Sequence, residues 1–175
     1  MSIDQQALNT LIAKEDIRQL VLLYSRGVDR KDIELLRTLY AKDATDDHGP
    51  HFQGAADDYM RFLERSFPHM RVSGHYVCNH LISVAGDEAD GEVYALAYHL
   101  IPDGKGGTIE DFAGVRYIDR YKKEGGRWLF AKRVVKFDLR SQRPVPTPEG
   151  AAPAPADDAS YAELVSRVFA RGARA

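Results

Sequence analysis

The chain has 175 residues, of which 44% are hydrophobic and 29% charged, and its formal net charge is -2. This composition is typical of one globular domain with a single core, and it argues against a nucleic-acid-binding protein, which would carry a basic stripe. One cysteine, no signal-peptide core in MSIDQQALNT and no apolar run near ~20 residues favour a cytoplasmic protein with no membrane partner.

Helices are predicted in the first third of the chain. Apolar residues recur at helical spacing across 7–27, and similar patterns predict a second helix over 30–41 and a third over 55–66. Between the last two, the run DATDDHGPHFQG is rich in Asp and Gly, which is typical of a short strand and a turn.

Strands are predicted in the remainder of the domain, near 72–85, 90–102, 108–123 and 127–140. The breaks between them, GDEADG, PDGKGG and KEGG, have hairpin turn chemistry, so the sheet is expected to be antiparallel and strongly curved. Helices followed by a meander predict an α+β fold with the helices on one face of the sheet. We expect a cone-shaped α+β barrel with a central pocket for a small ligand.

The C-terminal residues 143–175 are predicted to lie outside the domain formed by 1–142. The run RPVPTPEGAAPAPA, at 143–156, is rich in Pro and Ala and predicts an extended linker. A short amphipathic helix over 158–171 follows, and it is too short to be stable alone. We therefore expect it to pack on the same domain or on a neighbouring subunit.

Two histidines stand close together in SGHYVCNH, which begins the first long strand. In a regular strand, His75 and Asn79 share one face, whereas Cys78 and His80 share the other. One metal ion could not easily bind both histidines, so a functional His75 needs a partner from another part of the chain.

Two other groups of reactive side chains are interpreted as structural. His48 and His51 stand in DDHGPHF with two aspartates, but their spacing matches no metal signature and the stretch is predicted to be an exposed turn. Cys78 as a nucleophile would need a nearby base, which the sequence does not supply. We predict no metal site and no cofactor.

Two short motifs carry a family resemblance: YSRGVDRKD at the end of the first helix and GHYVCN at the start of the first long strand. Together with the order of elements, they resemble the SnoaL-like branch of the nuclear transport factor 2-like superfamily over roughly residues 8–140. Within this branch the chain is most similar to scytalone dehydratase, bile acid 7α-dehydratase and hexachlorocyclohexane dehydrochlorinase.

The resemblance implies a set of catalytic residues. Asp29 would hold His75, and His75 would be the base; Tyr24 matches a catalytic tyrosine, and His99 in YALAYHLIP matches a second histidine if a one-residue gap is allowed. The chain departs from scytalone dehydratase at Val28, where that enzyme has a tyrosine. For an arginine of the dehydrochlorinase, the last strand offers Arg133 and Lys136 only as candidates.

The implied chemistry is physically sensible. A neutral imidazole accepts a proton near neutral pH, and a carboxylate on its other nitrogen fixes the tautomer and stabilises the imidazolium. Two groups with separated pKa values could then serve as base and acid. Each residue also has a structural interpretation: Asp29 could be the N-cap of the second helix, His75 and Tyr24 could be core residues, and His99 could equally be one.

Three functions remain open. The first is a cofactor-independent lyase that eliminates water, halide or a small carbonyl fragment from a hydrophobic cyclic or aromatic molecule. The second is a ketosteroid-isomerase-like isomerase or a polyketide cyclase, and the third is a non-catalytic binding or assembly module. A homodimer or homotrimer is expected from the resemblance. The expected substrate-binding residues are Asn79, Phe52, Tyr59, Phe112 and Arg133.

Overall fold

The computed structural model describes residues 4–172 of the chain. Helix α1 is Gln5–Asp29, α2 is Ile33–Arg37 and α3 is Ala56–Ser66. The remaining elements are β1 (Tyr40–Asp47), β2 (Gln53–Ala55), β3 (Val72–Ala85), β4 (Glu88–Pro102), β5 (Thr108–Glu124), β6 (Arg127–Val145) and the short C-terminal α4 (Ala159–Glu163). No helix within 4–172 is long and apolar enough to cross a lipid bilayer.

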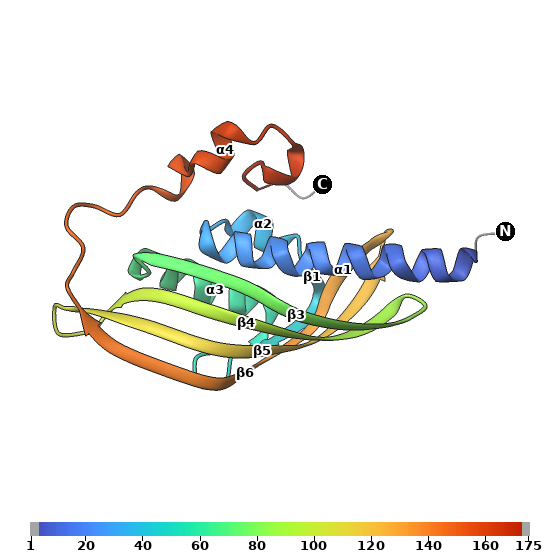
Figure 1. Cartoon of the computed structure of the whole chain (residues 1–175), viewed down its shortest axis with the longest axis horizontal. Coiled ribbons are helices and arrows are strands. Elements are labelled where there is room, and N and C mark those ends of the chain that lie inside the picture. The colour runs from blue at the N-terminus through green and yellow to red at the C-terminus, as the bar shows by residue number, and fades with distance from the viewer. Residues whose placement is uncertain (1–3, 173–175) are drawn as a thin grey trace.

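The strands form one curved sheet with the order β2-β1-β6-β5-β4-β3. Strands β3 to β6 are joined by antiparallel hairpins, whereas β1 pairs with β6 in parallel. The sheet is open between β2 and β3, and α1 and α3 lie along its concave side (Figure 1). The α+β fold with helices first and a mainly antiparallel sheet second is confirmed.

Helix α1 packs by one apolar stripe. Asp4 caps its first turn by accepting hydrogen bonds from the backbone amides of Gln6 and Ala7. On the buried stripe, Ile17, Leu20 and Val21 are completely buried at helical spacing. The same stripe continues to the end of the helix, so the residues of its last two turns are directed toward the interior of the cone.

The second helix is shorter than the predicted range of 30–41. Its N-cap is Asp32, whose side chain accepts the backbone amide of Leu35 at 3.1 Å. The helix ends at Arg37 because the chain then joins the sheet: the amide of Phe130 binds the carbonyl of Leu39, and β1 begins with the next residue. The N-cap is therefore Asp32, which leaves Asp29 available for another contact.

A β-bulge in β3 changes the face of every residue after it. Val77 pairs with Ala95 but His80 pairs with Val93, so three residue steps on β3 oppose two on β4. The prediction that His75 and His80 point to opposite faces is wrong, because this extra residue brings both onto the concave face. The same bulge leaves Cys78 and Asn79 exposed on the outside of the sheet.

The C-terminal segment also differs from its prediction. Strand β6 extends to Val145, within the range expected to be a linker. In place of one helix over 158–171 there are α4 and a 3-10 turn at Arg167–Phe169. The Arg26 guanidinium of α1 lies over the rings of both Tyr161 and Phe169, at 5.1 and 5.5 Å. A continuous helix would separate these rings by about 12 Å, so both could not meet one guanidinium. Figure 1 shows the segment lying over the outer side of α1.

Gly91→Ala tests the packing around His80, the residue that the bulge turns inward. An added Cβ would lie 2.8 Å from the Tyr121 ring and 3.2 Å from His80 Nε2, so we expect the free energy of unfolding to fall by about 1–3 kcal/mol. Urea unfolding would measure this change. Gly74→Ala is the control, because its Cβ would meet only the exposed Tyr76, at 3.4 Å. Equal destabilisation of the two variants would contradict the packing described here.

Candidate active site

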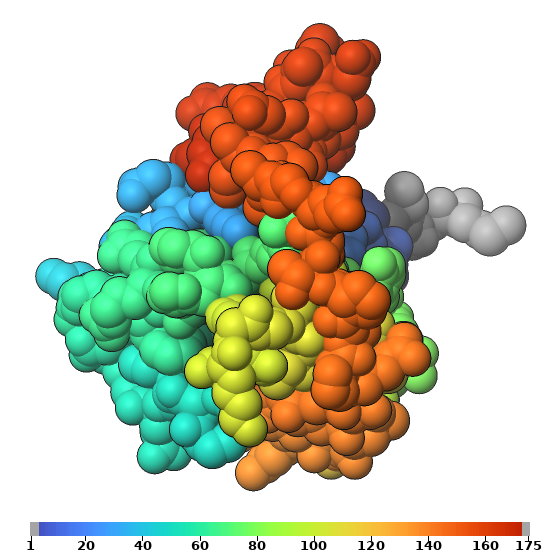
Figure 2. All heavy atoms as spheres, turned by 90° about the vertical axis from the view of Figure 1, so that its left-hand side faces the viewer, coloured from blue at the N-terminus to red at the C-terminus, as the bar shows by residue number. Residues whose placement is uncertain are grey.

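A cavity of about 210 Å³ lies between α1, α3 and the concave face of the sheet. Figure 2 views the end of the molecule where α3 and the β4–β5 turn border this hollow. Four of the six histidines of the chain line it, among mostly apolar side chains. The lining residues are Tyr24, Val28, His48, His51, Tyr59, Phe62, Leu63, Met70, His75, His99, Ile101, Asp111, Phe137 and Arg140.

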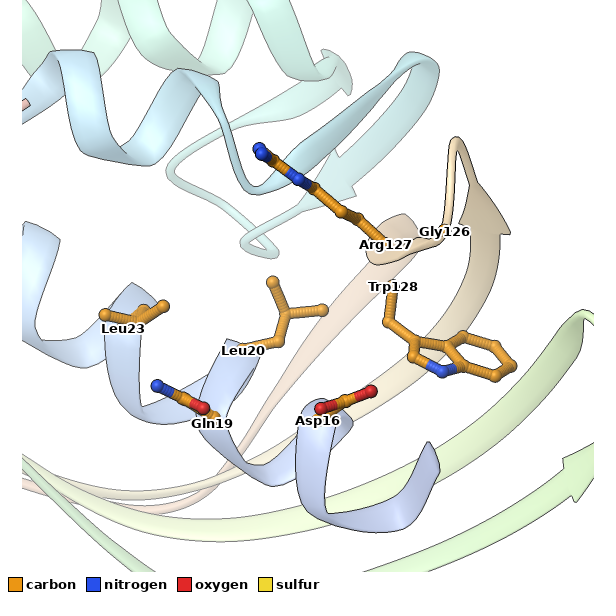
Figure 3. Close-up of a pocket in the computed structure, with 7 residues that line it drawn as sticks. All are labelled: Asp16, Gln19, Leu20, Leu23, Gly126, Arg127 and Trp128. Carbon is orange, nitrogen blue, oxygen red and sulfur yellow. The ribbon is translucent and has the colours of Figure 1, made fainter. Parts of the chain in front are cut away.

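A second cleft of about the same volume lies between α1 and the β5–β6 turn. Figure 3 shows the polar ends of Asp16, Gln19 and Arg127 around it, with Trp128 along one side. It has no histidine, cysteine or tyrosine among its lining residues, so it lacks the imidazole that most often acts as a general base near neutral pH. The first cavity is therefore the candidate active site.

Asp29 and His75 form a close pair at the cavity. Nδ1 of His75 lies 2.6 Å from Oδ1 of Asp29, and the His75 backbone amide donates to Oδ2 at 2.9 Å. The Ser73 hydroxyl donates to Oδ1 at 3.0 Å. Because the ionised carboxylate only accepts hydrogen bonds, Nδ1 carries the hydrogen and Nε2 is the ring nitrogen that Asp29 leaves unengaged.

The environment favours the ionised form of Asp29. Burial opposes ionisation, but the hydrogen bonds from His75 and Ser73 outweigh it, and the pKa of Asp29 is lowered from its ordinary value. Both side chains of the Asp29–His75 pair are almost completely buried. The imidazole is therefore held in one orientation by a charged group that has little contact with solvent.

His99 is brought beside His75. Their rings meet edge to face with centroids 5.2 Å apart, and His99 also lines the cavity. Burial, together with the charge of His75, lowers the pKa of His99 to about 4. His99 is thus neutral near pH 7, and it can donate or accept a hydrogen bond but does not carry a charge.

A second His–Asp pair lies on β1 and the turn after it, and the sequence interpretation missed it. His48 was expected in an exposed turn, yet its Nδ1 binds buried Asp46 and its ring stacks on Tyr59. Nε2 of His48 lies 3.0 Å from the Tyr59 hydroxyl and 3.4 Å from that of Tyr24. The sequence did contain a signal for this pair, because two residues separated by one position in an extended chain, such as Asp46 and His48, point to the same face.

Several expected substrate-binding residues do not line the cavity. Asn79 is exposed because of the bulge. Phe112 pairs with Tyr98 on the outer face of the sheet, because its neighbour Asp111 is the residue that faces inward. Phe52 packs behind Tyr59 rather than into the cavity.

Arg133 has a structural position rather than a lining one. It is completely buried and makes two hydrogen bonds to Asp119, at 2.7 and 2.8 Å. Its guanidinium lies 4.1 Å from the centroid of the Tyr24 ring and 4.2 Å from those of Tyr117 and Phe130. Its guanidinium packs against the Tyr24 ring on the side away from the cavity lining. Tyr24 and Tyr59 line the cavity, whereas Arg133 does not.

The mouth of the cavity carries a third polar group. Arg140 forms two hydrogen bonds, each of 2.8 Å, to Asp111, and another of its nitrogens lies 3.0 Å from Nε2 of His51. Burial and the charge of Arg140 lower the pKa of His51, which keeps that ring neutral. Within residues 4–172, no three His, Cys, Asp or Glu side chains are arranged to hold a metal ion.

A sequence model of the SnoaL-like domain matches residues 9–134. The match covers more than half of the chain and includes all the cavity-lining residues except Phe137 and Arg140 of β6. The chain belongs to this family. A comparison with curated protein sequences found no match.

Solved structures share the fold of this SnoaL-like domain. A protein of Novosphingobium aromaticivorans provisionally named a scytalone dehydratase has a TM-score of 0.68, with 23% identity over 82% of this chain and 93% of that one. The hexachlorocyclohexane dehydrochlorinase LinA-type3 of Novosphingobium barchaimii has a TM-score of 0.66, with 21% identity over 84% and 99%. A protein of unknown function from Mycobacterium tuberculosis has 0.64, with 18% identity over 75% of each chain.

His99→Gln tests the electrostatics of the SnoaL-like cavity. An unfolded His99 binds a proton near pH 6.5 and the folded one near pH 4, so the unfolded state binds more protons between these values. Stability should therefore decrease as pH falls through this range. Between about pH 7.5 and about pH 5, the wild type should lose about 2 kcal/mol more free energy of unfolding than His99→Gln.

Urea unfolding at the two pH values would measure this difference. His80 is present in both proteins, so its own contribution cancels. His69→Gln, at an exposed position, is the matched control and should keep the wild-type pH dependence. A wild-type pH dependence in His99→Gln would contradict the assignment of a neutral, buried His99.

Proposed function

We propose that this protein is a cofactor-independent lyase that eliminates water or a halide from a small, uncharged cyclic molecule. The observation that carries the proposal is the Asp29–His75 pair, whose unengaged Nε2 belongs to a residue lining an apolar cavity. Nδ1 is held by a carboxylate with a lowered pKa, so Nε2 is the basic position. Similarity in fold to a dehydrochlorinase and to a protein provisionally named a dehydratase supports the same class of reaction.

The charges around the cavity favour an uncharged substrate. Asp111 is paired with Arg140. Among the Asp, Glu, Lys and Arg side chains within residues 4–172, these two line the cavity, and their charges compensate each other. Binding a charged molecule would leave its charge poorly compensated among apolar walls, which is costly. A volume of about 210 Å³ suits a molecule built on one or two small rings.

The elimination can be written with balanced bonds. Nε2 of His75 takes a proton from the carbon next to the one that bears the leaving group. The electron pair of that C–H bond forms the double bond, and the leaving group departs with the pair of the bond that breaks. Burial raises the pKa of Tyr24 to about 12, so its hydroxyl is a neutral donor that can protonate the departing oxygen or stabilise a departing halide.

Conversion of a panel of cyclic β-hydroxyketones and halogenated alicyclic compounds would test the proposal. Loss of the mass of water or of hydrogen halide, followed by mass spectrometry, is the expected result. His75→Gln should lower kcat/KM at least about a hundredfold, because it removes the general base. Asp29→Asn should also lower it, because an amide would favour the wrong tautomer of His75.

His69→Gln is the matched control, since His69 is exposed and does not line the cavity. Turnover by His75→Gln at the rate of this control would contradict the proposal. A product with the same mass as the substrate would instead identify an isomerase or cyclase. Failure of every compound to react would support a non-catalytic binding module.

A further inference from the structure

We propose that His48 and Asp46 form a second proton-handling pair, which decides whether Tyr24 donates or accepts a hydrogen bond in the cavity. This inference rests on the proposed function, because it assigns the source of the proton that the leaving group takes. His48 is a positioning residue in this scheme, since it acts on the ligand through Tyr59 and Tyr24.

The partners of Asp46 determine the tautomer of His48. The Asp46 side chain is completely buried, and each of its oxygens faces one donor. The Tyr40 hydroxyl donates to Oδ2 at 2.7 Å, and Nδ1 of His48 binds Oδ1. An ionised carboxylate only accepts, so Nδ1 of His48 carries a hydrogen. In a neutral His48, Nε2 then carries a lone pair and accepts one hydrogen bond.

When His48 is neutral, the hydroxyls of Tyr24 and Tyr59 both donate their hydrogens within the cluster formed by Tyr24, Tyr59 and His48. The Tyr59 hydroxyl is 3.0 Å from Nε2 of His48, and the Tyr24 hydroxyl is 2.9 Å from that of Tyr59. The shortest chain of hydrogen bonds runs from Tyr24 to Tyr59 to His48. Tyr24 therefore offers only lone pairs to a ligand in this state.

Protonation of His48 reverses the chain. Nε2 then donates to Tyr59, Tyr59 donates to Tyr24, and the hydroxyl hydrogen of Tyr24 becomes available to the cavity. Burial keeps both phenols neutral, because it raises the pKa of Tyr24 to about 12 and that of Tyr59 well above its ordinary value. The cluster gains one proton at His48 and presents one donor at Tyr24.

Charged and titratable groups surround His48 on several elements. They are Asp46 and Asp47 on β1, Tyr40 at the start of β1, Tyr24 on α1, Tyr59 on α3, His51 in the β1–β2 turn and Arg133 on β6 beneath Tyr24.

In the elimination, the proton given to the leaving group passes along this chain. Tyr24 gives its hydroxyl proton to the departing group, Tyr59 gives its own to Tyr24, and His48 gives its Nε2 proton to Tyr59. At the end His75 has gained a proton and His48 has lost one, so a single proton exchange with solvent at each restores the starting state.

The tautomer of His48 is the first test. Long-range ¹H–¹⁵N spectra of the protein labelled at its histidines would identify the protonated nitrogen of neutral His48. We expect the Nδ1–H form. A neutral His48 with its hydrogen on Nε2 would overturn the inference, because the chain would then point toward Tyr24 at every pH.

The second test is the binding of cyclohexanone, which accepts hydrogen bonds but does not donate them. Chemical-shift titrations across the pH range in which His48 titrates would measure its affinity. We expect the affinity to fall about fivefold as His48 loses its proton, because the donor at Tyr24 is lost. An affinity that does not change across the His48 titration would overturn the inference.

Three variants identify the source of this pH dependence. His75→Gln should keep it, since the other His–Asp pair is not involved. Asp46→Asn should abolish it, because an amide donating to Nδ1 moves the histidine hydrogen to Nε2. His48→Gln should abolish it as well, and it remains informative if Asp46→Asn does not fold. Persistence of the pH dependence in His48→Gln would overturn the inference.

The binding measurement separates this inference from the proposed function. If no compound of the panel is converted but cyclohexanone binding follows the charge of His48, the lyase proposal fails and the switch at Tyr24 stands. If compounds are converted but the affinity for cyclohexanone does not change with the charge of His48, the lyase proposal stands and the switch at Tyr24 fails.

Discussion

The carboxylate of Asp29 joins the end of α1 to the beginning of β3, and the candidate site depends on this connection. It accepts hydrogen bonds from the backbone and ring of His75 and from the hydroxyl of Ser73. A buried charge is costly unless such bonds satisfy it. The hydrogen bonds that offset the cost of burying the Asp29 carboxylate also fix the orientation of the His75 imidazole. The stability of the fold and the chemistry of the site therefore both depend on Asp29.

A second buried charge supports the opposite side of the cavity. Arg133 and Asp119 are both buried, and three aromatic rings, including that of Tyr24, cover the guanidinium. Removing one partner of such a pair would leave an uncompensated charge in the core, so both members are expected to be structurally essential. Through this support the Tyr24 hydroxyl is held close to Tyr59 and His48.

The cavity thus lies between two His–Asp pairs with different surroundings. His75 leaves a ring nitrogen unengaged by its carboxylate, whereas both ring nitrogens of His48 have partners. The first arrangement suits a base that meets the substrate directly, and the second suits a relay that acts through phenols. Neutral His99 and the mutually neutralised Asp111 and Arg140 add polarity without adding net charge.

The sequence by itself predicted α1 and the four long strands, because helical periodicity and hairpin turns are local signals, whereas the pairing of Asp29 with His75 was only implied by the family resemblance. It could not place His80 and Asn79, because alternation assumes a regular strand and the bulge exists only in the pairing of β3 with β4. It also missed His48, because DDHGPHF has the composition of an exposed turn. Only the packing of α3 over that turn, with Tyr59 against the ring, brings His48 into the site.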